Sequence, residues 1–400
     1  MEAVLLHRPG VEIERMTPVD AHDALYSDLL NLDIVSNEYR YFSGVLERWT
    51  KVYYVEELLA EVLKEKHLKL NLVRESCRMD GCHFLEEELY SHSERRLASE
   101  LIEGYAYTGG VSASELRGKG HLYQLKPLYN LFFTRDASSS LFDKVLINSM
   151  SFPVRERETL IFKTIFERIF GAETLNAKSW NPEARTEGGD VQVVNDELLC
   201  VGCGIRTNRL GIDYIGETLS RERGRIKILV QELPVEPDSF IHLDMVHTFI
   251  GRHSCVDYEP MLRKTAEFEG KETALLTYEN GNLVNTCEYH DLLEGLRAEG
   301  VEMEPVLCGG DDLWNQQREQ WHSGANFFSL GDNKAIGYRR NKHTIEALDK
   351  AGFSILEAEK VCDGSVDMHD YEKFIVTFAA SELPRGGGGA RCMTMPLVRS

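Results

Sequence analysis

The sequence has no excess of basic residues, no long apolar run and no regular spacing of cysteines, and each absence argues against a class of protein. Lysine and arginine total 45 against 65 aspartate and glutamate residues, which gives the 400-residue chain a formal net charge of -20. A field of this sign repels phosphate backbones and anionic membrane surfaces. We therefore expect no nucleic-acid partner and no membrane partner.

No segment approaches the ~18 consecutive apolar residues that a membrane-spanning helix needs, and the first ten residues do not resemble a secretory signal. The nine cysteines are odd in number and scattered along the chain, which argues against a disulfide scaffold and favours a reducing compartment. The sequence therefore predicts a cytoplasmic protein.

Short apolar or alternating runs recur from end to end, and their lengths are typical of strands. Helical patterns lie between several of them, for example at 157–170 and 344–351. Alternating strands and helices predict an α/β protein. The runs are 3–7, 52–54, 144–147, 191–194, 198–201, 226–230, 239–246, 274–278, 335–338, 353–356 and 374–379.

One segment, residues 56–118, has a different composition. It is rich in Glu, Leu, Lys and Arg, with helical stretches at 56–65 and 86–102 and no convincing strand. Glycine-rich turns at 108–110 and 118–120 lie near its end. We interpret it as a helical insertion within a single catalytic domain that spans residues 1–400.

A glycine-rich loop near the C-terminus ends in a cysteine. Residues 386–389 are four glycines, and Cys392 follows in the segment Ala-Arg-Cys-Met-Thr-Met-Pro. Glycines let the backbone approach a ligand closely, whereas an isolated cysteine is more often an inert buried thiol. The context distinguishes Cys392 from the other cysteines.

A histidine and an aspartate stand two residues apart in the run 239–246. If the run is a strand, its period of two places His242 and Asp244 on the same face. The spacing of His242, Asp244 and His247 also suggests metal ligands, but His247 falls on the opposite face of such a strand, so we expect no metal site.

Two further acidic segments complete the set of candidate residues. Glu187 and Asp190 flank a Gly-Gly turn before an apolar run, and Asp136 ends the segment Asn-Leu-Phe-Phe-Thr-Arg-Asp that begins at Asn130. Each segment alone is an ordinary turn or ion pair. Together with Cys392 and His242 they supply a nucleophile, a general acid/base and carboxylates able to bind a cation.

With these residues the chain resembles the arginine deiminases of the guanidino-group-modifying superfamily, over nearly its whole length. The motifs that carry the resemblance occur in the family's order. They are His7 to Gly10, Asn130 to Asp136, Arg155 to Thr159, Glu187 to Val191, Arg206-Thr207, His242 to Asp244, Cys308 to Asp312, Arg318 to Trp321, Gly324 to Asn326, Tyr338 to Asn341 and Arg391 to Pro396.

The resemblance implies a five-bladed α/β-propeller of strand-helix modules around a pseudo-fivefold axis, with a helical insertion and a central active site. It implies hydrolysis of L-arginine to L-citrulline and ammonia through a covalent Cys-thiouronium intermediate, with no metal and no cofactor. Family members are commonly homo-oligomers, so a homodimer or larger assembly is expected.

The resemblance also implies a role for each site residue. Cys392 attacks the guanidinium carbon, His242 transfers protons, and Glu187 holds His242 in position. Asp136 and Asp244 bind the guanidinium nitrogens. The substrate-binding residues are Asn130, Phe133, Arg155, Asp190 and Arg206, of which Arg155 and Arg206 bind the α-carboxylate.

The chain departs from the family pattern in two places. Tyr129 replaces the usual proline before Asn130, and Ala137 replaces the customary proline after Asp136. In the nucleophile loop some members carry an arginine for the substrate carboxylate, where this chain has Gly387. Carboxylate recognition is therefore expected to depend on Arg155 and Arg206.

Two alternatives remain open at this point. One is a sister reaction on another guanidino or ureido compound, including amidino transfer; the two arginines argue against agmatine, which has no carboxylate. The other is an arginine-binding protein without catalysis. Retention of Cys392 argues against the second alternative, because binding alone does not need a nucleophile.

Overall fold

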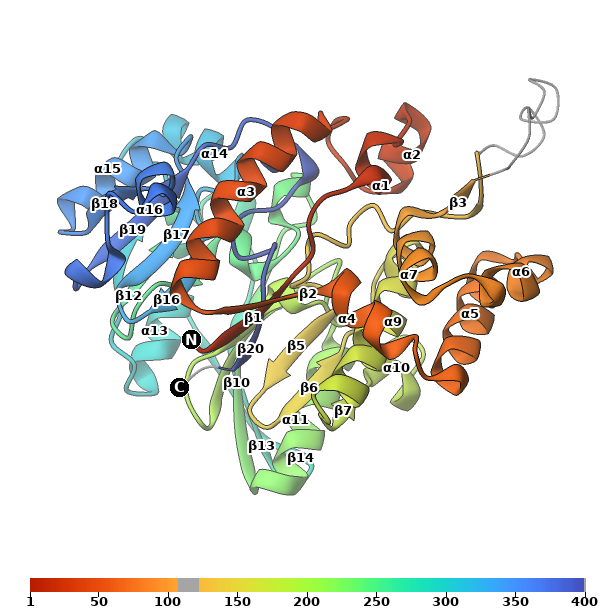
Figure 1. The fold of residues 1–400 in the computed structure, drawn as a ribbon. Coiled ribbons are helices and arrows are strands. Elements are labelled where there is room, and N and C mark those ends of the chain that lie inside the picture. The colour runs from red at the N-terminus through yellow and green to blue at the C-terminus, as the bar shows by residue number, and fades with distance from the viewer. Residues whose placement is uncertain (107–121, 399–400) are drawn as a thin grey trace.

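Six sheets and the helices around them form a mixed α/β architecture in the computed structural model, which describes residues 1–106 and 122–398 (Figure 1). The predicted α/β class is confirmed. All but one of the eleven apolar runs overlap a strand; the exception is 239–246, which contains two short 3-10 turns. Among the described residues, no helix combines the length and apolar character needed to cross a membrane.

The largest sheet has five strands in the order β14-β13-β10-β9-β8. Its central strand β10 runs antiparallel to β13 and parallel to β9. The strands are β8 (Val191–Val193), β9 (Leu198–Cys203), β10 (Arg225–Glu232), β13 (Thr273–Glu279) and β14 (Asn282–Tyr289).

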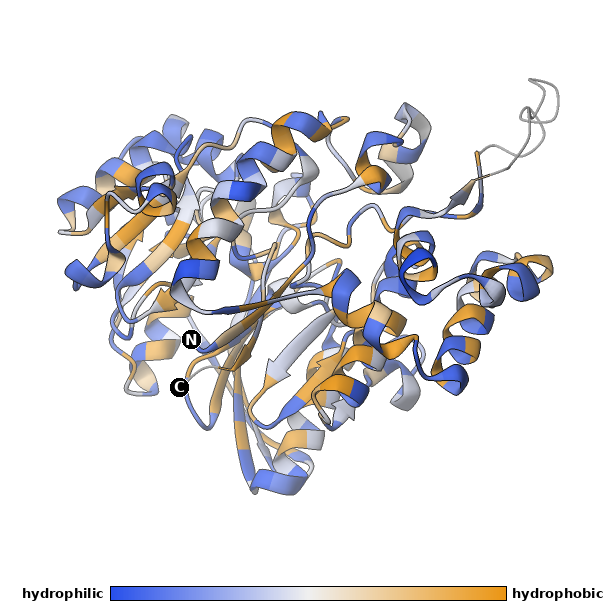
Figure 2. Cartoon of the chain, in the orientation of Figure 1, coloured by the Kyte–Doolittle hydropathy of each residue, from blue (hydrophilic) through white to orange (hydrophobic). Residues whose placement is uncertain are grey.

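Helices cover both faces of this sheet, which explains why its inner strands are almost continuously apolar. Ile228 packs with helix α11 (Arg209–Arg223), and the next residue, Leu229, packs with α13 (Leu292–Ala298) on the other face. The Asn208 side chain accepts from Gly211 N at 3.0 Å and so caps the start of α11. Figure 2 shows the hydrophobic residues along the strands and the hydrophilic residues on the outer helices.

Four smaller sheets have three or four strands each. The chain termini meet in one of them, where β1 pairs parallel with β2 and antiparallel with β20. The sheets are β2-β1-β20 (Lys51–Tyr54, Ala3–Leu6, Met395–Val398), β5-β6-β7 (Ser138–Leu141, Lys144–Ile147, Thr174–Leu175), β11-β12-β15 (His247–Phe249, Ser254–Asp257, Glu304–Leu307) and β16-β17-β19-β18 (Phe328–Gly331, Lys334–Tyr338, Phe374–Phe378, Ser354–Glu357).

Helices pack around these sheets, and the longest, α3 (Leu32–Trp49), buries Phe42 against Phe378 of β19. The remaining helices outside residues 55–103 are α1 (Val11–Glu14), α2 (Pro18–Asp23), α9 (Glu156–Ile169), α10 (Ala177–Trp180), α12 (Glu259–Leu262), α14 (Leu313–Trp321), α15 (Lys342–Lys350) and α16 (Ala358–Asp363).

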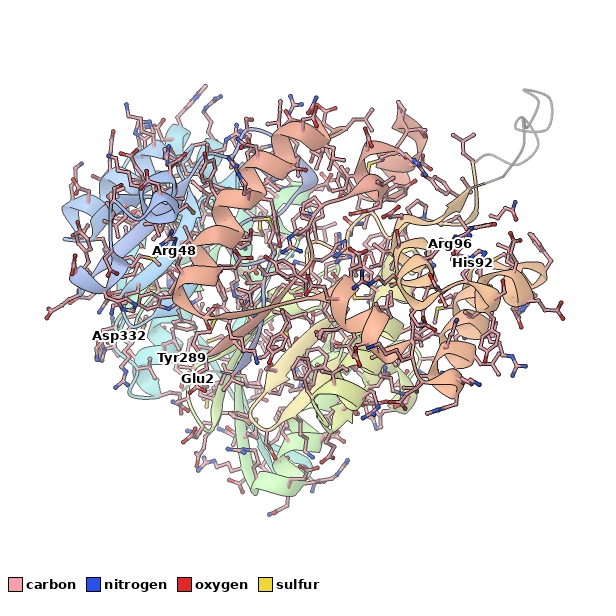
Figure 3. The ribbon with its side chains drawn as sticks, in the orientation of Figure 1. Glu2, Arg48, His92, Arg96, Tyr289 and Asp332 are labelled. Carbon is pink, nitrogen blue, oxygen red and sulfur yellow. The ribbon has the colours of Figure 1, made fainter. Side chains whose placement is uncertain are left out.

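Residues 55–103 form four helices, α4 (Val55–Val62), α5 (Lys66–Asp80), α6 (Glu86–Ser91) and α7 (Glu94–Glu103). A two-stranded ribbon of β3 (Tyr105–Ala106) and β4 (Tyr123–Leu125) follows. His92 and Arg96, labelled in Figure 3, both pair with Glu100 of α7. The expected glycine turns at 108–110 and 118–120 lie outside the described residues.

The four helices are packed directly onto the rest of the chain. Leu59, Leu72 and Leu97 from this segment share one buried cluster with Phe162 and Phe166 of α9. Their burial removes the apolar face of the segment from water.

Gly216 on α11 offers a test of this packing. A Cβ there would lie 2.4 Å from the ring of Tyr278 on β13, so we expect Gly216→Ala to lower the free energy of unfolding by about 1–3 kcal/mol, although alanine favours helices. Gly44→Ala on α3 is the control. Its Cβ would closely approach only the Sγ atom of Cys362, at 2.9 Å, and this side-chain end can move, so the loss in free energy of unfolding should be smaller. Urea denaturation measures both; stabilisation by Gly216→Ala would contradict the packing.

Candidate active site

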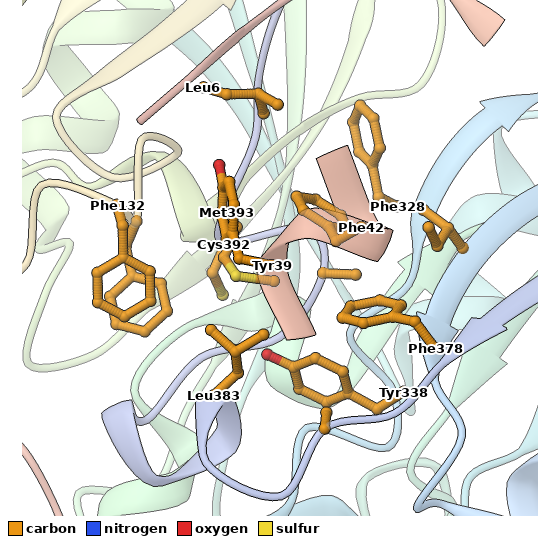
Figure 4. Packing of buried hydrophobic residues seen from close by; sticks show 14 of the residues in the cluster. Leu6, Tyr39, Phe42, Phe132, Phe328, Tyr338, Phe378, Leu383, Cys392 and Met393 are labelled. Atoms are coloured by element: carbon orange, nitrogen blue, oxygen red, sulfur yellow. The ribbon is translucent and has the colours of Figure 1, made fainter. Parts of the chain in front are cut away.

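Cys392 lies in a buried turn between the glycine loop and β20. Its exposed fraction is 2%, and its backbone oxygen accepts from Arg135 N at 3.0 Å. Figure 4 shows Cys392 among Leu383, Tyr338 and Met393 in the largest apolar cluster. The Tyr338 hydroxyl donates to Gly388 O at 2.9 Å and so anchors the glycine loop.

The expected strand through His242 and Asp244 is wrong. The segment holds two 3-10 turns, η4 (Asp238–Phe240) and η5 (Leu243–Met245). Gln320 explains the difference, because its side-chain amide binds Ser239 O at 3.0 Å and Met245 O at 3.2 Å in place of a neighbouring strand. His242 and Asp244 are nevertheless both buried; Asp244 Oδ2 lies 4.0 Å from Cys392 Sγ, and His242 lines the same small cavity as Cys392.

Glu187 connects His242 to Arg206. Its Oε2 atom is 3.0 Å from His242 Nε2 and 3.0 Å from Arg206 Nη1, and its Oε1 accepts from Ser151 N at 3.0 Å. The residue is fully buried. With Nε2 directed to Glu187, the His242 ring presents Nδ1 to the opposite side.

Two aspartates that were expected to bind a guanidinium already contact guanidinium groups of the chain. Asp136 Oδ2 accepts from Arg155 Nη1 at 2.6 Å, and Asp244 Oδ2 accepts from Arg391 Nη1 at 2.5 Å. Arg155 also binds Glu158 through Nε and Nη2. Each aspartate thus keeps one oxygen for another donor.

Three buried polar atoms at this point have no hydrogen-bond partner in the structure: Asp136 Oδ1, His242 Nδ1 and Asp244 Oδ1. Asp136 Oδ1 is 3.9 Å from His242 Nδ1, and Asp244 Oδ2 is 4.0 Å from Cys392 Sγ. Buried polar atoms are seldom left unpaired, because each costs free energy. A cationic ligand with several N–H donors would satisfy the two carboxylate oxygens.

The electrostatics of the site follow from burial and from these carboxylates. Burial acts to lower the pKa of His242, but Asp136 and Glu187 outweigh it and raise that pKa to about 9. Burial would raise the pKa of Glu187, yet Arg206 and His242 hold it well below its usual range. At neutral pH the site therefore holds a charged His242 and a charged Glu187.

The environment of Cys392 favours the neutral thiol. Burial, Asp244 and Asp136 raise the pKa of Cys392 well above its ordinary value. A thiol is a weak nucleophile, since attack requires the thiolate. Activation therefore needs positive charge or hydrogen-bond donors close to the sulfur.

A cavity of about 30 Å³ lies beside Cys392. Arginine does not fit a space this small, so entry requires its walls to part. Its lining includes the expected substrate-binding residues except Asp190, and of the two aspartates expected to bind the guanidinium it includes Asp136 but not Asp244. The lining residues are Leu25, Asn130, Phe133, Asp136, Arg155, Arg206, Ile241, His242, Gly386, Gly387, Gly388 and Cys392.

Asp190 lies behind His242 rather than on the cavity wall. Its Oδ1 accepts from Leu243 N at 2.9 Å, which fixes the turn that carries His242 and Asp244. Burial raises the pKa of Asp190 to about 7. Its position indicates a supporting contact with the histidine loop.

Three neighbours of the site had no predicted role. Arg391 binds Asp244, Glu158 binds Arg155, and Asn326 Nδ2 is 3.3 Å from Cys392 Sγ. All three belong to motifs that carried the family resemblance, but the sequence did not indicate the contacts that these residues make. Leu25 has φ of 67° and lines the cavity, and no motif marked it.

Two groups of side chains have metal-ligand chemistry within the described residues. One is Asp136, Glu187 and His242, and the other is His247, Cys255 and Asp257. In the second, His247 Nδ1 is 2.6 Å from Asp257 Oδ1 and Cys255 Sγ is 2.9 Å from Asp257 Oδ2. These are hydrogen-bond distances, so the carboxylate of Asp257 is already paired on both sides.

Residues 22–399 match the family model described as arginine deiminase. A protein named arginine deiminase from Bacillus cereus is 31% identical over 428 residues, covering 100% of this chain and 96% of the relative. Another, from Listeria monocytogenes serovar 1/2a, is 30% identical over 420 residues, covering 100% and 95%.

Solved structures share the fold at low identity. The N-terminal domain of ArgZ, named as an arginine dihydrolase from cyanobacteria, has a TM-score of 0.55 at 12% identity and covers 98% of this chain and 97% of that chain. DDAH from Pseudomonas aeruginosa, complexed with citrulline, has a TM-score of 0.54 at 10% identity and covers 98% of each chain.

The charge on His242 predicts a pH-dependent stability. The pKa of His242 in the folded protein is about 9, above its ordinary value of about 6.5. Protonated His242 therefore stabilises the fold fully below about pH 6.5, and this contribution is lost as the pH rises through about 9. Urea unfolding should show wild-type stability falling over this window by on the order of 3 kcal/mol. His242→Gln should remove most of this decline; an unchanged decline in the variant would contradict the assignment.

Proposed function

Because the chain belongs to the arginine deiminase family, we propose that it hydrolyses L-arginine to L-citrulline and ammonia with Cys392 as nucleophile. The observation that carries this proposal is the group of unpaired buried atoms beside the thiol, Asp136 Oδ1 and Asp244 Oδ1 together with His242 Nδ1. A guanidinium group offers N–H donors to both carboxylates and places its carbon near the sulfur.

Substrate charge supplies the activation that the free thiol lacks. A guanidinium bound between Asp136 and Asp244 places positive charge next to Cys392, which lowers the thiol pKa so that the thiol releases its proton to solvent as the substrate binds. The thiolate then attacks the guanidinium carbon and forms a C–S bond. Because of this coupling, the reactive thiolate forms only in the substrate-bound state.

His242 serves both halves of the reaction. Its proton passes to the departing nitrogen as the C–N bond breaks, which releases ammonia and leaves a thiouronium on Cys392. Neutral His242 then takes one proton from the attacking water, the C–S bond breaks, the second proton of that water passes to the departing sulfur, and citrulline leaves with the oxygen. Glu187 keeps the ring oriented through Nε2.

We assign the α-carboxylate to Arg155 and Arg206, which line the cavity. Arg155 also binds Asp136 and Glu158, so the two ends of the substrate site are joined by one ion-pair chain. Arg206 uses Nη1 for Glu187 and lies over the ring of Phe152. Asn130 and Phe133 shape the wall between the two ends.

The finer architecture we propose is the five-bladed α/β-propeller. In the described part of the chain, five of the six sheets have three or more strands, which supports one sheet for each blade. We propose a single catalytic domain over residues 1–400, with residues 56–118 as a helical insertion. The cluster shared by α4, α5, α7 and α9 supports this unity.

The expected setting of the protein belongs to the same proposal. The net charge of -20 supports binding of a small-molecule substrate and argues against nucleic-acid and membrane partners. The free cysteines support a cytoplasmic location. A homodimer or higher homo-oligomer is proposed by analogy with the family.

Turnover of L-arginine by the purified protein tests the function. We expect citrulline and ammonia in equal amounts, and Cys392→Ala should lower turnover by more than about 10³-fold because no nucleophile remains. Cys287→Ala, which removes a half-buried thiol on β14, is the matched control and should retain activity.

The two alternatives give different results in the same assay. Release of a product only from agmatine, methylarginine or citrulline would replace arginine with a sister substrate. Binding of arginine by calorimetry with no turnover of any of the four compounds would indicate a binding protein.

Arg206→Ala tests the carboxylate assignment. Agmatine is arginine without the carboxylate, so loss of an arginine–carboxylate contact should lower kcat/KM for arginine about 100-fold more than for agmatine. Comparing the two substrates cancels any effect of the lost Arg206–Glu187 pair on chemistry. An equal decline for both would place the carboxylate elsewhere.

A further inference from the structure

We propose that Asn326 is a further catalytic residue, which donates a hydrogen bond from its side-chain amide to the Cys392 thiolate. The inference rests on the proposed function in that Cys392 is the nucleophile. Asn326 Nδ2 lies 3.3 Å from Cys392 Sγ, within the range of N–H donation to sulfur, and Asn326 is 1% exposed. It therefore touches the reacting atom from the protein side.

The orientation of the amide is determined by its partners. Asn326 Oδ1 accepts from Arg391 N at 2.9 Å and from Cys392 N at 3.3 Å. Backbone N–H groups cannot accept, so the oxygen must face them and the amide nitrogen must face the other side. On that side are three acceptors, Asp244 O at 3.1 Å, Cys392 Sγ at 3.3 Å and Met245 Sδ at 3.7 Å.

A glycine allows this approach. A Cβ at Gly389 would lie 2.5 Å from Asn326 Oδ1 and 2.6 Å from its Cβ, so any larger residue would displace the amide. The glycine loop thus admits Asn326 behind the nucleophile. Asn326 is not among the residues that line the cavity, and it leaves the face of the sulfur toward the substrate open.

The sulfur needs such a donor. Burial, Asp244 and Asp136 all raise the pKa of Cys392, and both aspartates must stay charged to bind a guanidinium. A neutral N–H donor stabilises the thiolate without competing with the cation for these carboxylates. The same N–H donor would stabilise the thiolate again when the C–S bond breaks.

Asn326→Asp separates this role from loop structure. The aspartate keeps an oxygen for the N–H groups of Arg391 and Cys392 but loses the donor to sulfur. We expect the rate of Cys392 alkylation by iodoacetamide at pH 8 to fall at least about tenfold and its pH profile to move about one to two units upward. Peptide mass spectrometry distinguishes Cys392 from the other cysteines.

Asn326→Ala removes the donor without adding charge and should give the same direction of change, with kcat falling about 10- to 100-fold and KM for arginine nearly unchanged. Tyr338→Phe is the matched control. It removes the hydroxyl that donates to Gly388 O, which loosens the same loop without removing a hydrogen-bond donor from the sulfur. Its alkylation profile should stay at the wild-type pH.

The outcomes are distinguishable from failure of the proposed function, because alkylation requires no turnover. A wild-type profile in folded Asn326→Asp and Asn326→Ala would overturn the inference even if citrulline is formed. Equal shifts in Tyr338→Phe would also overturn it, since loop order alone would explain them. A shift confined to the Asn326 variants would support it, even in a protein inactive on arginine.

Discussion

The buried carboxylate of Glu187 is the contact on which the site depends. A charge without solvent is costly unless it is paired and hydrogen-bonded, and Glu187 meets both requirements through His242, Arg206 and Ser151 N. Together with the charge of Asp136, this pairing keeps His242 charged, and it leaves Nδ1 of the ring on the side of Asp136. In the proposed mechanism the general acid is therefore in place before any substrate arrives.

The aspartates follow from the same low-dielectric setting. Asp136 and Asp244 each use one oxygen for an arginine of the chain and leave the other unpaired. The internal pairs hold the carboxylates in fixed positions, so a guanidinium meets acceptors that are already oriented. The unpaired oxygens cost free energy in the free state, and the proposed binding of a guanidinium would remove that cost.

The sequence was a better guide to the chemistry of the family than to the course of the backbone. The α/β class and half of the described strands follow from apolar runs such as 226–230, which is β10. It could not find β5, because Ser138–Leu141 is largely serine, nor β14, whose residues are mostly exposed. In both, pairing with a neighbouring strand overrides a weak local pattern.

The turn at 239–246 shows why a local pattern can be wrong about structure and useful about function. Alternation suggested a strand, but Gln320, about 80 residues away in sequence, supplies the partners that make it a turn. His242 and Asp244 still converge on the site, because Asp190 holds Leu243 N and Arg391 holds Asp244. No property of the segment itself records these distant contacts.

Close approach of loops explains the remaining residues that sequence alone left without a role. A Cβ at Gly188 would lie 2.0 Å from Arg135 O, and one at Gly189 would lie 2.4 Å from His242 Nδ1. Glycines at these points let the segments around Asp136, Glu187 and His242 pack backbone to side chain. Asn326 reaches the sulfur in the same way past Gly389, so the spacing of glycines determines which distant side chains meet Cys392.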